Sequence, residues 1–134
     1  MQLFRPMLAE FDLTEQQWRV LRALSACDGP IEVTVLAERT FLLSPSLSRI
    51  LTNLEERNLI TRQTPESDQR RSLISLSDGG IELVTRVAPE SERRYNAIER
   101  EFGSERLHRL LAELDDLAAL DTGAIELDGD SPDA

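Results

Sequence analysis

The chain has 134 residues, of which 40% are hydrophobic and 30% charged, and it carries a formal net charge of −10 at pH 7. This length and composition favour one globular domain with a core of its own, and no apolar run reaches the roughly 18 residues of a membrane-spanning helix. Cys27 is the single cysteine, so we expect no intrachain disulfide and a reducing, cytoplasmic location. The N-terminus lacks a basic region followed by an apolar core, so no signal peptide is expected.

The first 30 residues are expected to form two helices. Apolar residues at helical spacing indicate the first over residues 2–10, with Pro6 near its start. Thr14 and Gln17 have the spacing of a capping box, in which each side chain satisfies the backbone N–H of the other, so a second helix should begin there. The segment 27–30, Cys-Asp-Gly-Pro, should end it.

The middle of the chain predicts two more helices joined by a tight turn. The first is short and covers about residues 33–40. In the second, Ser44 is expected to be the N-cap and Pro45 the first residue, and Asn58 has the position of a left-handed residue that ends a helix. The apolar residues of this second helix recur at helical spacing: Leu47, Ile50, Leu51 and Leu54. This pattern is typical of a helix-turn-helix.

A short hairpin should follow the second of these helices. Residues 59–62 and 73–76 are predicted to be its strands, joined by a polar loop with two arginines over residues 63–71. A hairpin of this size is not stable alone, so we expect it to pack on the helices. A helix followed by such a hairpin is the pattern of a recognition helix with a β-wing, which indicates double-stranded DNA as a partner.

The net charge is the main argument against DNA binding, and it is unevenly distributed. Residues 121–134 hold five acids and no basic residue, which is half of the excess negative charge. Residues 42–77 instead hold five arginines against four acids, a local charge of +1. A basic face of this size still neutralises phosphates, but we expect modest non-specific affinity and a strong dependence on dimerisation.

Two helices are expected after the hairpin. The first should begin at Ser77 and Asp78, run to about Phe102, and be kinked or broken at Pro89. Its predicted apolar side consists of Ile81, Val84, Ala88, Tyr95, Ile98 and Phe102. The second starts near residues 103–104 and has a leucine stripe: Leu107, Leu110, Leu111, Leu114 and Leu117. The predicted fold is therefore all-α with a small β-hairpin wing, followed by an acidic, disordered tail over residues 121–134.

Four motifs together are similar to those of a known family. They are Leu13-Thr14-x-x-Gln17, Leu36-Ala37-Glu38, Leu54-Glu55-x-x-x-Leu59-Ile60-x-Arg62 and Asp68-x-Arg70-x-x-x-Ile74-x-Leu76-Ser77. On these motifs, over about residues 3–120, the sequence resembles the multiple antibiotic resistance regulator (MarR) family of winged-helix repressors. It is most similar to the branch that regulates homoprotocatechuate (3,4-dihydroxyphenylacetate) degradation, through Phe4-Arg5-Pro6, residues 13–19, Pro45-Ser46-Leu47, Ile50-Leu51-Thr52 and Asp68-Gln69-Arg70.

The resemblance implies a homodimer that binds a pseudo-palindromic operator, represses an aromatic catabolic operon and is released by a small phenolic acid. Residues 1–120 would form one domain, with residues 12–77 as the winged-helix part and residues 1–11 and 78–120 as interlocking dimerisation helices. The first helix of the family begins further upstream than the ten residues that precede Phe11 here. Either the dimer interface is shorter in this chain, or its start was assigned late.

Polar residues off the apolar stripe of the recognition helix are the candidate DNA contacts. Arg49 is the one long cation of this face and suits guanine O6 and N7 or a phosphate. On the wing, Arg70 is expected to enter a narrow minor groove, and the family pattern gives Asp68 the role of holding the wing arginine. The alternatives are a solvated helix face and a charged, solvated turn. The complete predicted set is Ser44, Ser46, Ser48, Arg49, Thr52, Asn53, Asp68, Arg70 and Arg71.

A second set of residues is the candidate effector pocket. Trp18 and Arg22 lie four residues apart, on one side of a predicted helix. Together with Phe4 and Leu8 they suit a phenolic carboxylate, because an arginine stands beside an aromatic wall. The alternatives are that Trp18 is a core residue and that Arg22 pairs with a surface acid. The effector itself could also be a different phenolic acid or an antibiotic-like compound.

No enzyme chemistry or cofactor is predicted. One histidine and one cysteine, distant in sequence, do not make a metal cluster, and Gly79-Gly80 lacks the rest of a phosphate-binding motif. The alternative from another class is a winged helix used for protein–protein contact, which the charge of −10 and the thin basic patch motivate.

Overall fold

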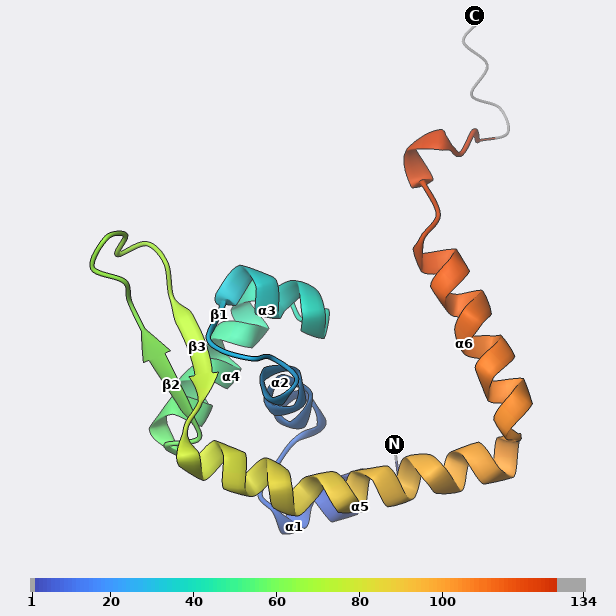
Figure 1. Ribbon diagram of the computed structural model, residues 1–134, viewed down its shortest axis with the longest axis horizontal. Coiled ribbons are helices and arrows are strands. Elements are labelled where there is room, and N and C mark those ends of the chain that lie inside the picture. Colours follow the sequence, from blue (N-terminus) through green and yellow to red (C-terminus); the bar gives the residue numbers. More distant parts are fainter. Residues whose placement is uncertain (1, 128–134) are drawn as a thin grey trace, which may run out of the picture. The chain divides into compact units, whose positions relative to one another are not determined.

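The computed structural model describes residues 2–127, and it is mostly helical with one small antiparallel sheet (Figure 1). The predicted fold class is therefore confirmed. The chain divides into two compact units, residues 1–94 and residues 95–134. The elements are α1 (Arg5–Glu10), α2 (Glu15–Ser25), β1 (Ile31–Glu32), α3 (Val33–Thr40), α4 (Ser44–Glu56), β2 (Ile60–Gln63), β3 (Leu73–Leu76), α5 (Asp78–Phe102), α6 (Ser104–Ala118) and a 3-10 turn (Thr122–Ala124).

Side-chain capping fixes where α2 begins. The Thr14 backbone N–H donates to Gln17 Oε1 at 2.9 Å, and the Gln17 backbone N–H donates to Thr14 Oγ1 at 3.2 Å. The predicted capping box is thus confirmed, and both orphan N–H groups are satisfied. Pro6 lies in the first turn of α1, as predicted, where its missing N–H has no helical partner to lose.

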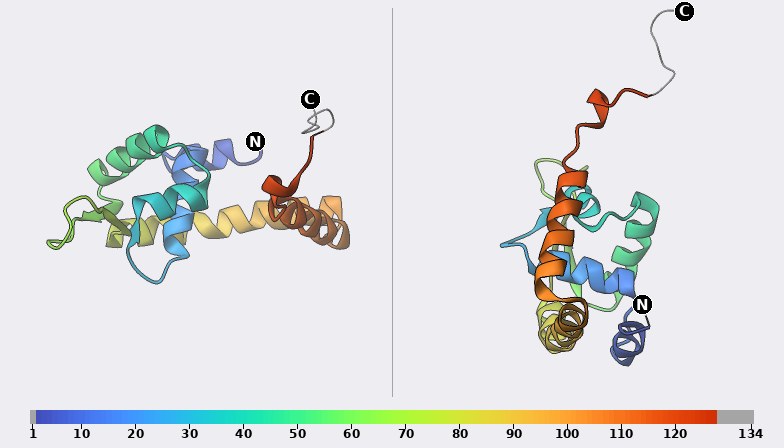
Figure 2. Two further views of the ribbon diagram at one scale, coloured as in Figure 1. Left: turned by 90° about the horizontal axis from the view of Figure 1, so that it is seen from above. Right: turned by 90° about the vertical axis from the view of Figure 1, so that its right-hand side faces the viewer.

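The sheet has three strands, in the order β1-β3-β2. Ile31 pairs with Ile74 across β1 and β3, and Ile60 pairs with Leu76 across β2 and β3. The sequence predicted the two strands of the hairpin but not β1, which has two residues and is too short to show an alternating pattern. The third strand stabilises the base of the wing, whose loop extends away from the helices (Figure 2).

The recognition helix α4 packs as predicted but begins one residue earlier. Its N-cap is Leu43, with φ −68° and ψ 145°, and no side chain caps it. Ser44 is therefore the first helical residue, and its predicted capping role is wrong. Pro45 does not distinguish the two starts, because proline fits either of the first helical positions. The four apolar residues of the predicted stripe are all buried: Leu47, Ile50, Leu51 and Leu54.

Left-handed residues limit α4 on both sides. Phe41, in the turn that joins α3 to α4, has φ 56°, and Asn58 has φ 58°. The left-handed conformation predicted for Asn58 is confirmed. At Phe41 a bulky side chain in this conformation is strained, so packing elsewhere must hold the turn in place. Leu36 of α3 and Leu47 of α4 supply such packing, since both are fully buried.

The start of α5 is tied to the end of α4. Ser77 Oγ donates to the Asn58 carbonyl at 2.6 Å and accepts from the Gly80 backbone N–H at 3.1 Å. The side chain therefore caps α5 and joins it to the turn before the wing. Gly80 is buried against the backbone of the turn before β2, and an added Cβ would lie 2.0 Å from the Leu59 carbonyl oxygen.

The apolar face of α5 differs in part from the prediction. Val87 is fully buried and Ser91 nearly so, whereas Ile81 is 53% exposed. Helical periodicity gives the faces of a long helix, but only its neighbours decide which residues of a wide face are covered. The helix runs through Pro89 without a break, contrary to one of the two expected outcomes.

The second unit exposes a leucine-rich helix. Each of the leucines at 110, 111, 114 and 117 of α6 is between 45% and 62% exposed. Gly103, with φ 104°, separates α5 from α6, and the Arg106 guanidinium lies over the Phe102 ring, 4.3 Å from its centroid. In the predicted acidic tail, Asp121 caps the 3-10 turn, and residues 128–134 lie outside the described part.

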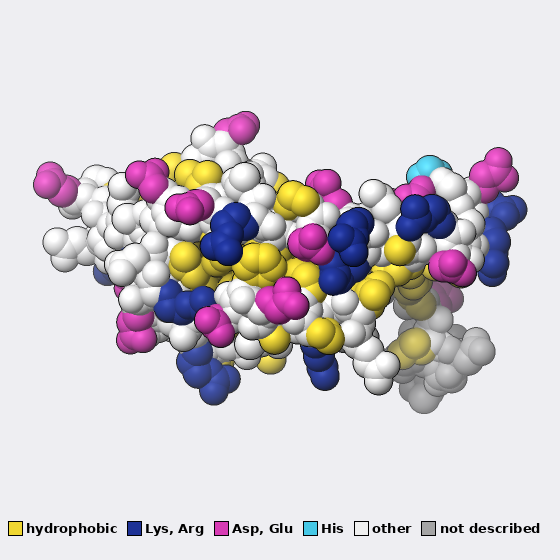
Figure 3. Space-filling model, turned by 90° about the horizontal axis from the view of Figure 1, so that it is seen from below, with side chains coloured by type: hydrophobic (Ala, Val, Ile, Leu, Met, Phe, Trp, Pro, Cys, Tyr) yellow, Lys and Arg dark blue, Asp and Glu magenta, His cyan; other side chains and the backbone are white. Residues whose placement is uncertain are grey.

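The surface mixes hydrophobic and charged groups. Figure 3 shows exposed hydrophobic side chains in yellow between arginines and acids on the face seen from below. Over residues 2–127, none of the helices has the length and hydropathy needed to cross a membrane.

Candidate nucleic-acid interface and effector site

The polar side of α4 is open to solvent. Ser44, Ser48, Arg49 and Thr52 are exposed, and Ser46 is half-buried. Within residues 2–127, the Arg49 side chain has no ion pair or hydrogen bond that would hold it to the protein surface. The helix therefore has one buried apolar side and one exposed side with a cation, which is the division that docking in a groove requires.

Asn53, the remaining predicted residue of α4, is held from another helix. The Gln17 side-chain amide donates from Nε2 to Asn53 Oδ1 at 3.0 Å. Sequence reasoning assigned Gln17 to the capping box and missed this second contact. No local signal could have revealed it, because the two residues are 36 positions apart and meet only when α2 packs on α4.

The wing loop is ordered by Asp68. Its Oδ1 accepts the Arg70 backbone N–H at 3.0 Å, and its backbone takes part in two successive turns, Asp68 N to Pro65 O at 3.3 Å and Arg71 N to Asp68 O at 3.2 Å. The carboxylate thus acts on the backbone of the wing arginine rather than on its guanidinium. The Arg70 side chain is exposed and has no ion pair among the described residues.

The two wing arginines differ in their surroundings. Arg71 forms an ion pair with Glu32, and its Nε donates to Glu32 Oε1 at 2.6 Å. Because Glu32 lies on β1, this contact ties the wing to the strand that the sequence did not predict. Arg62 pairs more loosely with Glu55, at 3.6 Å. These arginines surround a hollow of about 430 Å³ at the base of the wing, beside the start of α3.

The residues of the predicted effector pocket are not alike in burial. Phe4, Leu8 and Trp18 belong to the hydrophobic core of the first unit, and Arg22 is exposed. Trp18 is only 5% exposed. Its indole N–H is buried and has no hydrogen-bond partner among the described residues. A buried donor without a partner lowers the stability of the folded protein, so a bound ligand that supplies an acceptor to this N–H would be favourable.

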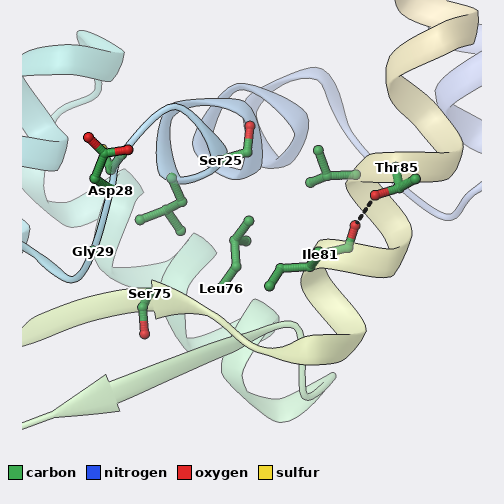
Figure 4. Close-up of a pocket in the computed structure, with 10 residues that line it drawn as sticks. Ser25, Asp28, Gly29, Ser75, Leu76, Ile81 and Thr85 are labelled. Atoms are coloured by element: carbon green, nitrogen blue, oxygen red, sulfur yellow. Dashed lines mark hydrogen bonds between the residues drawn. The ribbon is translucent and has the colours of Figure 1, made fainter.

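A different hollow, of about 460 Å³, lies between the end of α2, β3 and the start of α5. Leu76 and Ile81 point into it, and the Thr85 hydroxyl on its edge donates to the Ile81 carbonyl at 2.8 Å (Figure 4). The predicted effector residues do not line this hollow.

Arg94 fastens the N-terminal segment to α5. Its Nε donates to the Leu3 carbonyl at 3.0 Å, and its Nη1 donates to Glu90 Oε2 at 2.9 Å. The Arg94 hydrogen bond and the nearby Arg93 charge lower the pKa of Glu90. The contact at Leu3 thus holds the adjacent residue, Phe4, beside α5.

Within residues 2–127, no three His, Cys, Asp or Glu side chains are grouped to hold a metal ion.

Comparison with known proteins gives one consistent result. The model of the MarR family matches residues 11–71. The homoprotocatechuate degradative operon repressor of Escherichia coli is 37% identical over 120 residues, which cover 90% of this chain and 80% of that repressor. This relative is a repressor of transcription and not an enzyme.

Two solved structures share the fold over most of their length. The structure of NadR in complex with 4-hydroxyphenylacetate has a TM-score of 0.76 and 38% identity, and the match covers 90% of this chain and 85% of NadR. The complex of Staphylococcus aureus MepR with DNA has a TM-score of 0.80 and 27% identity, covering 89% and 88%. On the sequence match, the shared fold and the winged-helix geometry, the chain belongs to the MarR family.

Proposed function

We propose that this chain is a cytoplasmic, homodimeric transcriptional repressor. It binds a pseudo-palindromic operator through α4 and the wing, and a phenolic acid such as 4-hydroxyphenylacetate or homoprotocatechuate releases it. The observation that carries the proposal is the division of α4 into a fully buried apolar side and an exposed polar side next to an ordered wing. Residues 12–77 are the DNA-binding part of this proposal, and residues 1–11 and 78–120 supply the dimer contacts.

On DNA, α4 lies in the major groove with Arg49 toward guanine O6 and N7 or a phosphate. Ser44, Ser46, Ser48 and Thr52 contribute shorter contacts along the same side. The wing follows the backbone into the adjacent minor groove, where Arg70 meets the concentrated negative potential. A two-fold dimer presents two such sets, which must be about 34–36 Å apart to enter successive major grooves.

The two wing arginines have different roles in this proposal. Arg70 is the minor-groove contact, because its guanidinium is not engaged by an acid among the described residues. Arg71 supports the wing from behind through Glu32 and contributes to the positive potential of the hollow. Few cations reach the DNA from each subunit, so we expect a shallow dependence of affinity on salt for a monomer and a steeper one for the dimer.

Dimerisation explains the exposed leucines of α6. A helix with a continuous apolar stripe is stable only when that stripe is covered, and a second copy of the chain is the covering surface that two-fold operator binding requires. The leucines at positions 110, 111, 114 and 117 are therefore assigned to the dimer interface, together with α1 and the C-terminal part of α5.

The effector site is built around Trp18. Its indole N–H, which has no hydrogen-bond partner among residues 2–127, offers a hydrogen bond to a carboxylate or phenolic oxygen, and Arg22 follows four residues later on the same side of α2. Phe4 and Leu8 supply apolar walls for an aromatic ring. The ligand of the NadR complex, 4-hydroxyphenylacetate, has these two polar groups, a phenol and a carboxylate, on one ring.

Release follows from differential affinity. A ligand that binds better to a dimer whose recognition helices have the wrong separation shifts the population away from the DNA-binding form. To reverse a 99:1 preference, the ligand must favour the second form by about 10⁴-fold.

The test is a fluorescence anisotropy titration with the intergenic DNA upstream of the coding sequence, at two salt concentrations, with and without 4-hydroxyphenylacetate. The proposal expects salt-sensitive binding that the ligand reverses. Binding without reversal would reject the effector class, and absence of binding to this or random duplex DNA would reject the regulator and favour a protein-interaction module. Trp18→Phe keeps an aromatic ring but removes the N–H, so it should keep DNA binding and lose most of the ligand response.

A further inference from the structure

We infer that Gln17 is a positioning residue for sequence readout: it holds the side-chain amide of Asn53 so that the nitrogen, a hydrogen-bond donor, and not the oxygen is turned toward DNA. The inference rests on the proposed function and concerns how the α4 surface discriminates among bases. It assigns a role to a residue of α2 that does not itself belong to the recognition helix.

The orientation of Gln17 follows from a backbone group. The Thr14 backbone N–H can only donate, and it lies 2.9 Å from the oxygen of the Gln17 amide. The oxygen must therefore be Oε1, and the other end of the amide is Nε2, which can only donate. The second half of the capping box, from the Gln17 backbone N–H to Thr14 Oγ1 at 3.2 Å, holds the same turn rigid.

The orientation of Asn53 follows from that of Gln17. Since Nε2 is a donor, the Asn53 atom 3.0 Å from it must be the acceptor Oδ1. The Asn53 amide nitrogen then points away from Gln17. Asn53 is exposed and lies off the buried stripe of α4, while Gln17 is half-buried between α2 and α4. A single backbone N–H thus determines, through two amides, which atom α4 offers at this position.

This orientation restricts what Asn53 can recognise. Bidentate pairing with adenine needs both amide atoms, the oxygen for N6–H and the nitrogen for N7. Here the oxygen is turned toward Gln17 and accepts its N–H, so the nitrogen is the atom turned outward, and it selects acceptors. These are purine N7, guanine O6 and thymine O4 in the major groove, or a phosphate oxygen of the backbone.

Gln17→Glu reverses the polarity of this relay without removing the capping box. A carboxylate accepts at both oxygens, so one oxygen still receives the Thr14 N–H. The other oxygen can only accept from Asn53, which must turn its amide nitrogen inward and its oxygen outward. Gln16→Glu is the matched control, because it adds the same charge at the adjacent exposed position of α2.

The experiment measures the operator affinity of the dimer with single base and backbone analogues. The base analogues are 7-deazapurines, which lack the N7 acceptor, 2-aminopurine in place of guanine, which lacks O6, and 5-methyl-2-pyrimidinone in place of thymine, which lacks O4; methylphosphonates lack one anionic oxygen of the backbone. Asn53→Ala identifies the operator position that Asn53 contacts: it is the position at which an analogue weakens binding of the unmodified protein but not of Asn53→Ala. At that site we expect the unmodified protein and the control variant Gln16→Glu to lose roughly three- to tenfold in affinity, as for one hydrogen bond. Gln17→Glu should lose nothing there and keep its response at the site read by Arg49.

Each outcome decides. An effect of a base analogue identifies a base as the acceptor, and an effect of a methylphosphonate identifies a phosphate; either effect supports the inference if Gln17→Glu abolishes it. An analogue profile of Gln17→Glu equal to that of the unmodified protein would overturn the inference, and so would the absence of any site that depends on Asn53. Neither result would affect the proposed function. Absence of salt-dependent binding by the unmodified protein would overturn both.

Discussion

Gly80 is a position at which the packing of the structure leaves no room for a side chain. In an exposed helix interior, replacing glycine by alanine stabilises the helix by up to about 1 kcal/mol. Gly80 is buried in the first turn of α5, and a Cβ there would lie 2.0 Å from the Leu59 carbonyl oxygen and 3.1 Å from Leu76 Cδ2. The atom in the way is backbone, so rotation of a side chain cannot relieve the contact.

The expected cost of Gly80→Ala follows from what must move. The Leu59 carbonyl accepts the Ser77 backbone N–H at 3.1 Å, and an outward shift would break that bond. Overpacking costs about 1–3 kcal/mol, and a lost hydrogen bond about 0.5–1.5 kcal/mol. After subtracting the gain in helix propensity, we expect a net destabilisation of about 1–4 kcal/mol, which lowers the Tm by roughly 3–20 °C in a chain of this size.

Thermal unfolding followed by circular dichroism at fixed protein concentration measures this effect, since the Tm of a dimer depends on concentration. Gly79→Ala is the control. It lies one residue earlier in the same turn, is exposed, and its Cβ would be 3.2 Å from the Asn58 carbonyl oxygen. We expect its Tm to change by less than about a third of the Gly80→Ala shift. An unchanged or raised Tm for Gly80→Ala would refute the packing of α5 against Leu59, the residue just before β2.

Three further predictions concern the proposed function and the N-terminal contact. Arg49→Ala should weaken operator binding by about 1–3 kcal/mol in an anisotropy titration, whereas Arg109→Ala, which removes the same charge from α6, should not; equal losses would remove Arg49 from the interface. Leu114→Glu should convert the dimer to monomer in light scattering, because its loss counts twice across a two-fold axis; an intact dimer would show that α6 lies outside the interface. Arg94 lowers the pKa of Glu90, so the stabilising effect of the ionised carboxylate is present above the unfolded pKa and is lost as pH falls through the folded one. The Tm advantage of the unmodified protein over Glu90→Gln should therefore shrink below about pH 4, and a difference independent of pH would contradict this role.

Much of the fold could be predicted from local sequence. The capping box at Thr14, the buried stripe of α4 from Leu47 to Leu54 and the left-handed Asn58 all depend on interactions within a few residues, which the sequence displays directly. The wing was predictable for the same reason, because alternating strands and a polar loop are local features. The start of α4 was wrong by one residue, since Pro45 is compatible with either start.

The elements that the sequence did not reveal depend on distant partners. The strand β1 exists because Ile31 and Glu32 pair with β3, far along the chain, in the register Ile31–Ile74 and Glu32–Leu73. The burial of Val87 in place of Ile81 likewise depends on how α5 packs, which its own periodicity leaves open.

For the candidate site, the sequence alone shows which side chains are available: an arginine on the polar side of α4, two on the wing, and a tryptophan four residues before an arginine on α2. How these side chains are used depends on packing. The folded chain engages Arg71 with Glu32 while leaving Arg70 exposed, brings Gln17 against Asn53, and buries the Trp18 N–H without a partner among the described residues. A hydrogen bond or ion pair requires atoms within about 3–4 Å, and between residues far apart in the chain that distance is set by packing and not by sequence spacing.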